Sequence, residues 1–313
     1  MELKEGGQVV NEDEWFFESI RRYEHLFMYD MEAKDGEKAL CISVSPSGDR
    51  WVLLTTNDLG VYASPSSLKT NVILPKRDAP LIAGIYLEER PKLVFFLTED
   101  SLVTPIGLWR VSQTDILQRN RDINIKNLKV LHSYKERTLA ISHDAVYSIL
   151  SESDSKLCSH NSDIASALLS KDGIPTVLKK DGSVYTDDQL DFQLNLPFPT
   201  DNLIFLSAHY IFVTLSEKVK DKYVLYKKTE RLFHLEDTLA LDFRLSPNEE
   251  YLSYITKDNL VIKVLSIKSG GNLIFQHDGH RLPIVSHCWH SKIPNTVYSL
   301  DSGKNIHIWK FKV

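Results

Sequence analysis

The chain has 313 residues and a formal net charge of −5 at pH 7, and hydrophobic residues make up 42% of it. This is the profile of an ordinary globular chain that buries a sizeable core. No stretch approaches the roughly 18 uninterrupted apolar residues of a membrane span, and the first residues lack the cationic and apolar regions of a secretory signal. Cys41, Cys158 and Cys288 are too few and too scattered for a disulfide framework, so we expect an intracellular protein of the cytoplasm or nucleus.

The negative charge is concentrated at the start of the chain. Residues 1–36 hold ten acidic and four basic residues, a net of −6, and the remaining 277 residues carry a net of +1. Binding nucleic acid chiefly through phosphate neutralisation needs a basic face, and this overall charge balance does not supply one.

A short helix is predicted within the acidic segment 1–24. Asn11 and Glu14 have the spacing of a capping box, and Phe16, Ile20 and Tyr23 fall on one helix face. This apolar face either packs against the rest of the chain or docks a partner protein. The candidate partner-binding residues are Trp15, Phe16, Ile20, Arg21 and Arg22.

From residue 25 onward, short apolar or alternating runs separated by turn signals predict β-strands. Two stretches share the same order of a strand, a turn at Ser45-Pro46 or Ser246-Pro247, and a second strand. The first strands of such units are expected near residues 38, 81, 127, 163, 202, 239 and 282, at intervals of 36–46 residues. A repeat of about 40–45 residues with four strands predicts an all-β, seven-bladed β-propeller over 25–313, with a two-sheet sandwich as the competing fold.

The two ends of this region complement each other. The last unit ends with its third strand, at 305–311, and a strand over 25–31 has no unit of its own. Placing the early strand at the outer edge of the last blade closes the ring and removes an open sheet edge. We therefore expect an N-terminal strand to complete the seventh blade.

Residues 279–311 resemble a Trp-Asp (WD40) repeat, with Gly279-His280 near the start and Trp309 near the end. In that family a His, a Ser or Thr, an Asp and a Trp form a buried hydrogen-bonded network in each blade. The expected Asp position, six residues before the Trp, holds Gly303. The residues that the resemblance assigns to such networks are His280, Ser299, Asp301 and Trp309, together with Asp258 of the preceding unit.

Two His-x-x-His pairs, His277 with His280 and His287 with His290, invite a zinc interpretation. On a strand, however, His287 and His290 face opposite ways, so the second pair does not converge and no metal or other cofactor is expected. The sequence contains no Gly-x-Ser-x-Gly elbow, phosphate loop or dinucleotide fingerprint. We expect a non-enzyme, and the alternative is a hydrolase whose active site is assembled from distant loops.

A basic stretch at 217–231 has two interpretations. It is either a β-hairpin with a solvated tip at 218–222, whose lysines guard the sheet edge, or a contact for RNA or DNA that is positioned for a partner enzyme. The candidate nucleic-acid residues are Lys218, Lys220, Lys222, Lys227 and Lys228.

The resemblance to Trp-Asp repeats implies a common role, that of a non-catalytic scaffold or adaptor subunit in an intracellular multiprotein complex. We expect one or more protein partners, because a propeller offers a rigid ring with broad faces.

Overall fold

A computed structural model of the chain describes residues 23–29, 38–44, 48, 50–55, 58–63, 67–73, 81–86, 92–98, 106–111, 117–123, 125, 128–134, 137–149, 154–159, 163–169, 173–196, 200–215, 223–235, 240–256 and 258–312. Among these residues, none lies in a helix long and apolar enough to cross a membrane. The helix predicted in segment 1–24 lies outside the described residues, apart from Tyr23, which belongs to a strand.

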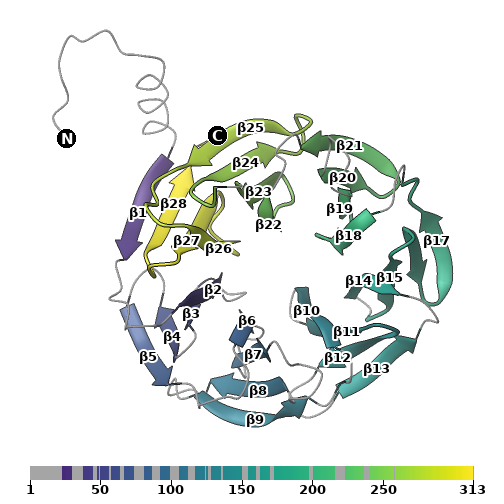
Figure 1. The fold of residues 1–313 in the computed structure, drawn as a ribbon, viewed down its shortest axis with the longest axis horizontal. Coiled ribbons are helices and arrows are strands. Elements are labelled where there is room, and N and C mark those ends of the chain that lie inside the picture. The colour runs from purple at the N-terminus through teal and green to yellow at the C-terminus, as the bar shows by residue number, and fades with distance from the viewer. Residues whose placement is uncertain are drawn as a thin grey trace, which may run out of the picture.

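The described strands pair into seven four-stranded antiparallel sheets, which stand side by side in a ring (Figure 1). Their bounds, sheet by sheet, are β2 (Ala39–Val44), β3 (Arg50–Thr55), β4 (Asp58–Ala63), β5 (Ser67–Ile73); β6 (Leu81–Tyr86), β7 (Lys92–Thr98), β8 (Ile106–Val111), β9 (Leu117–Ile123); β10 (Leu128–Tyr134), β11 (Arg137–Ser142), β12 (Ala145–Ile149), β13 (Asp154–Ser159); β14 (Ile164–Leu169), β15 (Pro175–Lys179), β16 (Ser183–Thr186), β17 (Gln189–Gln193); β18 (Thr200–Phe205), β19 (Tyr210–Leu215), β20 (Tyr223–Lys227), β21 (Glu230–Leu235); β22 (Leu241–Leu245), β23 (Tyr251–Ile255), β24 (Ile262–Ser266), β25 (Asn272–His277); and β26 (Ile284–Trp289), β27 (Thr296–Asp301), β28 (Ile306–Phe311) with β1 (Tyr23–Tyr29).

The all-β expectation is confirmed, and the first strand of each sheet begins within two residues of its predicted position. The last sheet is completed from the other end of the chain, because β1 pairs with β28 and sets Tyr23 opposite Phe311 and Tyr29 opposite Ile306. The early strand therefore starts at Tyr23, whereas the sequence analysis placed that residue on the helix face.

The first and last sheets also pack against each other. Trp51 of β3 is fully buried, and its ring centroid lies 6.2 Å from that of Tyr298 on β27. These two rings belong to one cluster that draws on both sheets. The ring is thus closed at this point both by strand pairing and by apolar packing.

A β-bulge recurs where the first two strands of each sheet begin to pair. The register shifts between Ala39 and Cys41 in the first sheet and between Ile284 and Ser286 in the last, with an equivalent shift in each of the five sheets between them. One extra residue bends a strand and increases its twist. The bulge therefore repeats in the structure although the residues that form it differ from sheet to sheet.

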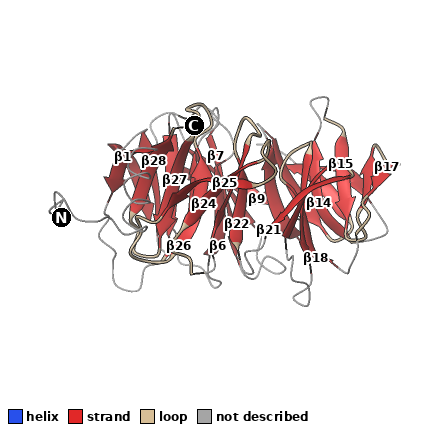
Figure 2. Cartoon of the chain, turned by 90° about the horizontal axis from the view of Figure 1, so that it is seen from above, coloured by secondary structure: helices blue, strands red, loops and turns tan. Residues whose placement is uncertain are grey.

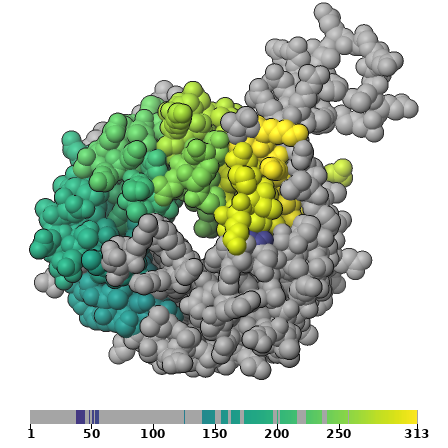
Figure 3. Space-filling view, turned by 180° about the vertical axis from the view of Figure 1, so that it is seen from behind, coloured from purple at the N-terminus to yellow at the C-terminus, as the bar shows by residue number. Residues whose placement is uncertain are grey.

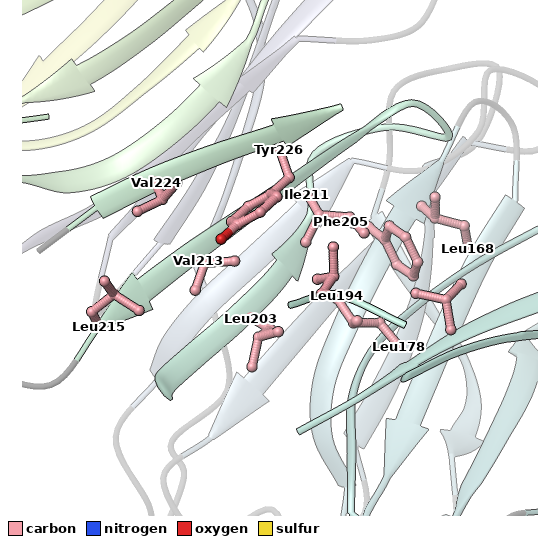
Figure 4. Packing of buried hydrophobic residues seen from close by; sticks show 11 residues of the cluster. Leu168, Leu178, Leu194, Leu203, Phe205, Ile211, Val213, Leu215, Val224 and Tyr226 are labelled. Atoms are coloured by element: carbon pink, nitrogen blue, oxygen red, sulfur yellow. The ribbon is translucent and has the colours of Figure 1, made fainter. Parts of the chain in front are cut away.

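Apolar residues fill the spaces between neighbouring sheets. Between the β14–β17 and β18–β21 sheets, Leu178 and Leu194 pack with Phe205, Ile211 and Val213 (Figure 4). Viewed from the side, the strands span the thickness of the ring (Figure 2). Each cluster among the described residues draws on two neighbouring sheets, so packing between sheets adds to the strand pairing within them.

Turn chemistry at Ser246-Pro247-Asn248 matches the sequence prediction. The Ser246 hydroxyl lies 2.7 Å from Asn248 Oδ1 and accepts a hydrogen bond from Tyr251 N at 2.9 Å. Glu249, at φ 60°, donates its backbone N–H to the Ser246 carbonyl. Proline and these local hydrogen bonds fix the reversal between β22 and β23.

Candidate functional site

The structure brings His280, Ser299, Asp301 and Trp309 together in one hydrogen-bonded set, which we term the within-sheet network. His280 Nε2 lies 2.7 Å from Ser299 Oγ, and His280 Nδ1 lies 3.2 Å from Asp301 Oδ2. Trp309 Nε1 donates to Ser299 Oγ at 3.4 Å. All four side chains are buried, and three of them lie on β27 and β28.

Asp301 supplies the carboxylate of this network, two residues before the position where Gly303 stands. Gly303 instead donates its backbone N–H to Asp301 Oδ1 at 2.9 Å, and Asn305 binds both carboxylate oxygens. Burial raises the pKa of Asp301, but the hydrogen bonds from His280 and Asn305 outweigh it and hold the pKa below its usual value.

Asp258, which the resemblance assigns to a network of the preceding unit, lies in a turn of the β22–β25 sheet. Its carboxylate accepts hydrogen bonds from the Thr256 hydroxyl and from Leu260 N, and its side chain is exposed. The Thr256 hydroxyl is the main cause that lowers the pKa of Asp258, against a smaller opposing effect of burial. Asp258 therefore stabilises the turn between β23 and β24.

A second set of the same four residue types, absent from the sequence predictions, joins two sheets. In this between-sheet network Ser253 Oγ lies 2.7 Å from His287 Nε2, and His287 Nδ1 lies 3.1 Å from Asp242 Oδ2. Trp289 Nε1 donates to Ser253 Oγ at 2.8 Å. Asp242 and Ser253 lie on β22 and β23, whereas His287 and Trp289 lie on β26 of the next sheet.

Asp242 is the most constrained member of the between-sheet network. It lies in the bulge of β22 with φ 48°, and its Oδ1 forms an ion pair with Arg244 Nη2 at 2.8 Å. Burial raises the pKa of Asp242, but Arg244 and the hydrogen bonds from His287 outweigh it and depress the pKa strongly. The same ion pair raises the pKa of the Arg244 guanidinium.

In both networks a histidine lies between a serine and an aspartate, as in hydrolytic triads, but neither serine is accessible to a substrate. Ser253 and Ser299 are each 0% exposed. Each hydroxyl also contacts an indole N–H and a backbone carbonyl, Arg244 O for Ser253 and His307 O for Ser299. A catalytic serine must reach a substrate carbonyl, so the geometry of both sets is that of structural cross-links.

Of the four histidines of the zinc interpretation, His287 and His290 contact different neighbours, although His290 lies just beyond the end of β26 at Trp289. His287 contacts Asp242 and Ser253 on one neighbouring sheet, whereas His290 packs on Gly48 of the other and accepts hydrogen bonds from Lys292 N and Ile293 N. The two His-x-x-His pairs therefore do not form one site.

Another histidine, His307, instead joins His277 and His280. One ring nitrogen of each lies within 4.8 Å of the others, and all three side chains are buried. These imidazoles are the kind of ligand that binds zinc. Both ring nitrogens of His280 are already hydrogen-bonded, however, so a cation binds there only if the within-sheet network opens.

The remaining candidates are partly outside the described residues. Trp15, Phe16, Ile20, Arg21 and Arg22 lie there, as do Lys218, Lys220 and Lys222. Lys227 ends β20 and Lys228 lies in the following turn at φ 53°.

Comparison with solved structures defines the class of fold. No protein-family model matches the chain, and no curated protein matches its sequence. The chain is similar to the β-propeller domain of Myceliophteria thermophila Cps50 (Swd1), with TM-score 0.63, 10% identity and coverage of 90% of this chain and 98% of that one.

Two further solved structures show the same likeness. A chain in the structure of the mitotic checkpoint complex matches with TM-score 0.67, 10% identity and coverage of 100% and 97%, respectively. The WD40 β-propeller domain of Doa1 matches with TM-score 0.64, 12% identity and coverage of 92% and 97%. This chain therefore has the β-propeller fold of these structures. At these identities the likeness concerns the fold alone.

Proposed function

We propose that this chain is a non-catalytic scaffold, a seven-bladed WD40-like propeller that holds partner proteins in an intracellular complex. The observation that carries the proposal is that the Ser–His–Asp sets are sealed inside and between the sheets, where they cross-link the ring. The seven described sheets and the pairing of β1 with β28 support a closed ring of seven blades. Such a ring presents its faces, loops and channel to other molecules while changing its own shape little.

The structural neighbours support the same role by analogy. One of them is a chain in the structure of the mitotic checkpoint complex, an assembly of proteins. A shared fold does not transfer a partner, so the identity of the assembly is left to experiment.

The acidic N-terminal segment is the proposed docking element. Trp15, Phe16 and Ile20 would supply apolar anchors, because buried aromatic residues dominate the energy of many interfaces. Residues 1–22 of this segment precede β1, which begins at Tyr23, so their removal leaves the strand that pairs with β28 in place.

Purification of the tagged chain from its native cell tests the proposal, with the full chain compared with variants lacking 1–22 or only 1–10. We expect a stoichiometric protein partner with the full chain and with the shorter deletion, and its loss when 1–22 is removed. If all three forms retain the partner, the partner binds to the ring and not to residues 1–22. The absence of any stoichiometric partner would overturn the scaffold proposal.

A further inference from the structure

A pocket opens between two neighbouring sheets of the ring, at their inner strands β18 and β22. Its volume is about 590 Å³, within the range of roughly 300–1,000 Å³ that is typical of ligand sites. These strands are the inner strands of their sheets (Figure 1), and the space-filling view shows an opening at the centre of the ring (Figure 3). Residues from both strands line the pocket, among them Ile204, Leu241, Phe243 and Arg244.

The wall of the pocket is aromatic. The ring centroid of Phe243 lies 3.9 Å from that of Phe212 and 5.0 Å from that of Tyr223. The Tyr223 hydroxyl donates to the carbonyl of Ala240 at 2.9 Å, which holds the start of β22 against the β18–β21 sheet. Since these rings pack on one another, the wall is rigid and preformed.

Large apolar side chains extend this wall toward solvent. On β18 Leu203 and Phe205 are buried, whereas Ile204 between them is 37% exposed, as the alternation of a strand requires. Leu241 on β22 is 51% exposed. Exposed apolar residues that border a pocket mark a binding surface more strongly than scattered ones do.

Arg244 adds one cation to this apolar pocket. Its Nη2 lies 2.8 Å from Asp242 Oδ1, and its side chain is 53% exposed. The opposite carboxylate oxygen, Asp242 Oδ2, is held by the backbone N–H and Nδ1 of His287. The between-sheet network therefore fixes the carboxylate that pairs with Arg244, and about half of the Arg244 side chain remains exposed. A guanidinium has five N–H donors, more than one carboxylate uses.

We propose that this pocket binds a segment of a partner protein in which an Asp or Glu adjoins a large apolar side chain. The carboxylate would pair with Arg244, and the apolar side chain would pack on Phe243 and Leu241. Among the described residues that line the pocket, Arg244 is the one base, and Asp242 offsets its charge. Nucleic acid needs several cations along its backbone, so an acidic, apolar peptide fits this chemistry better. The inference rests on the proposed scaffold function and specifies its surface.

Fluorescein-labelled pools of short peptides test the proposal with the full chain. Each pool fixes Asp, Asn or Lys beside a Leu or Phe and varies the other positions. We expect fluorescence polarisation to show binding of the Asp pool. The affinity of the Asn and Lys pools is expected to be at least about tenfold lower. No binding of the Asp pool at about 1 mM, or equal binding of the three pools, would overturn the proposal.

Three variants assign the binding to the pocket. Arg244→Gln is expected to abolish the preference for Asp over Asn, and Lys268→Gln, on an exposed turn of the same sheet, is expected to preserve it. Leu241→Ser is expected to weaken the binding of all three pools while the Asp242–Arg244 ion pair is kept. This variant tests the pocket even if Arg244→Gln does not fold. Asp-pool binding that is unchanged in Arg244→Gln and in Leu241→Ser would overturn the proposal.

The native complex separates this inference from the scaffold proposal. A stoichiometric partner that is retained by Arg244→Gln, with no pool binding, would leave the scaffold in place and remove the pocket from its interface. The absence of any partner would instead overturn the scaffold proposal itself.

Discussion

His287 of β26 reaches across to the neighbouring sheet and places its Nε2 2.7 Å from the hydroxyl of Ser253 on β23. Both side chains are 0% exposed, and their positions in the sequence differ by 34 residues. Polar groups buried this deeply stabilise a fold only when their hydrogen bonds are made. The contact therefore fixes the position of one sheet relative to the other.

Replacement of Ser253 by Ala is expected to destabilise the ring. The variant leaves His287 Nε2 without its 2.7 Å partner and removes the shorter hydrogen bond of Trp289 Nε1. We expect the free energy of unfolding in urea to fall by about 1–3 kcal/mol. Ser302→Ala, on an exposed turn, is the control and is expected to change it by less than about 0.5 kcal/mol. Equal stabilities of the two variants would contradict the cross-link.

The carboxylate of Asp242 is expected to make stability depend on pH. Its pKa is depressed in the folded chain by Arg244 and His287, against the opposing effect of burial. A depressed folded pKa stabilises the chain above the unfolded value of about 3.9, and this stabilisation is lost as the pH falls toward the folded value. The difference in unfolding free energy between the native chain and Asp242→Asn should thus be constant above about pH 5 and shrink below about pH 4. A difference that does not vary down to pH 3 would show that the ion pair contributes nothing.

Two glycines with similar backbone angles offer a matched steric test. Gly48 has φ 73° and Gly270 has φ 70°. A Cβ at Gly48 would overlap Cε1 of His290, whereas a Cβ at Gly270 meets nothing within 4 Å. Gly270→Ala is expected to lower the unfolding free energy by about 1–2 kcal/mol, because the left-handed region is unfavourable for alanine.

Gly48→Ala is expected to destabilise by roughly 1–3 kcal/mol more than Gly270→Ala, since overlap is added to backbone strain. The double variant Gly48→Ala/His290→Ala should be more stable than the sum of the single changes predicts, which identifies His290 as the group that clashes. Equal effects of the two glycine substitutions in urea unfolding would contradict the close packing between the first and last sheets.

Two cysteines are expected to resist alkylation in the folded chain. Burial raises the pKa of Cys158 to about 11, and burial likewise raises that of Cys288. Because the thiolate is the reactive form, iodoacetamide at pH 8 should label both residues far more slowly in buffer than in urea. Peptide mass spectrometry measures the two rates, and similar rates in buffer and urea would contradict the burial of these thiols.

Periodicity in the sequence predicts much of this fold. The Ser-Pro turn at Ser246 and the spacing of apolar runs locate the first strands, and the unpaired early strand predicts the pairing of β1 with β28. These features are local, because a turn or an alternating run is determined by neighbouring residues. Side-chain contacts between sheets are not local, so periodicity does not reveal them.

The two networks show this limit. His280, Ser299 and Trp309 follow a known repeat spacing, but the identity of the acidic partner depends on how the turn at Asp301–Asn305 folds. Asp242 lies 45 residues from His287 and reaches it from a bulge at φ 48°. The between-sheet network has the same four residue types, Asp, His, Ser and Trp, as the within-sheet network. These residue types are visible in the sequence, but they form a network only after two sheets are placed in contact.

The mass of the native assembly tests the scaffold account most directly. The full chain, tagged at its own locus and extracted without denaturation, is separated by size and analysed by native mass spectrometry. The account predicts a species well above the 35.9 kDa of the chain, with other proteins present in fixed ratio. A species of 35.9 kDa alone, at the cellular concentration of the protein, would contradict it.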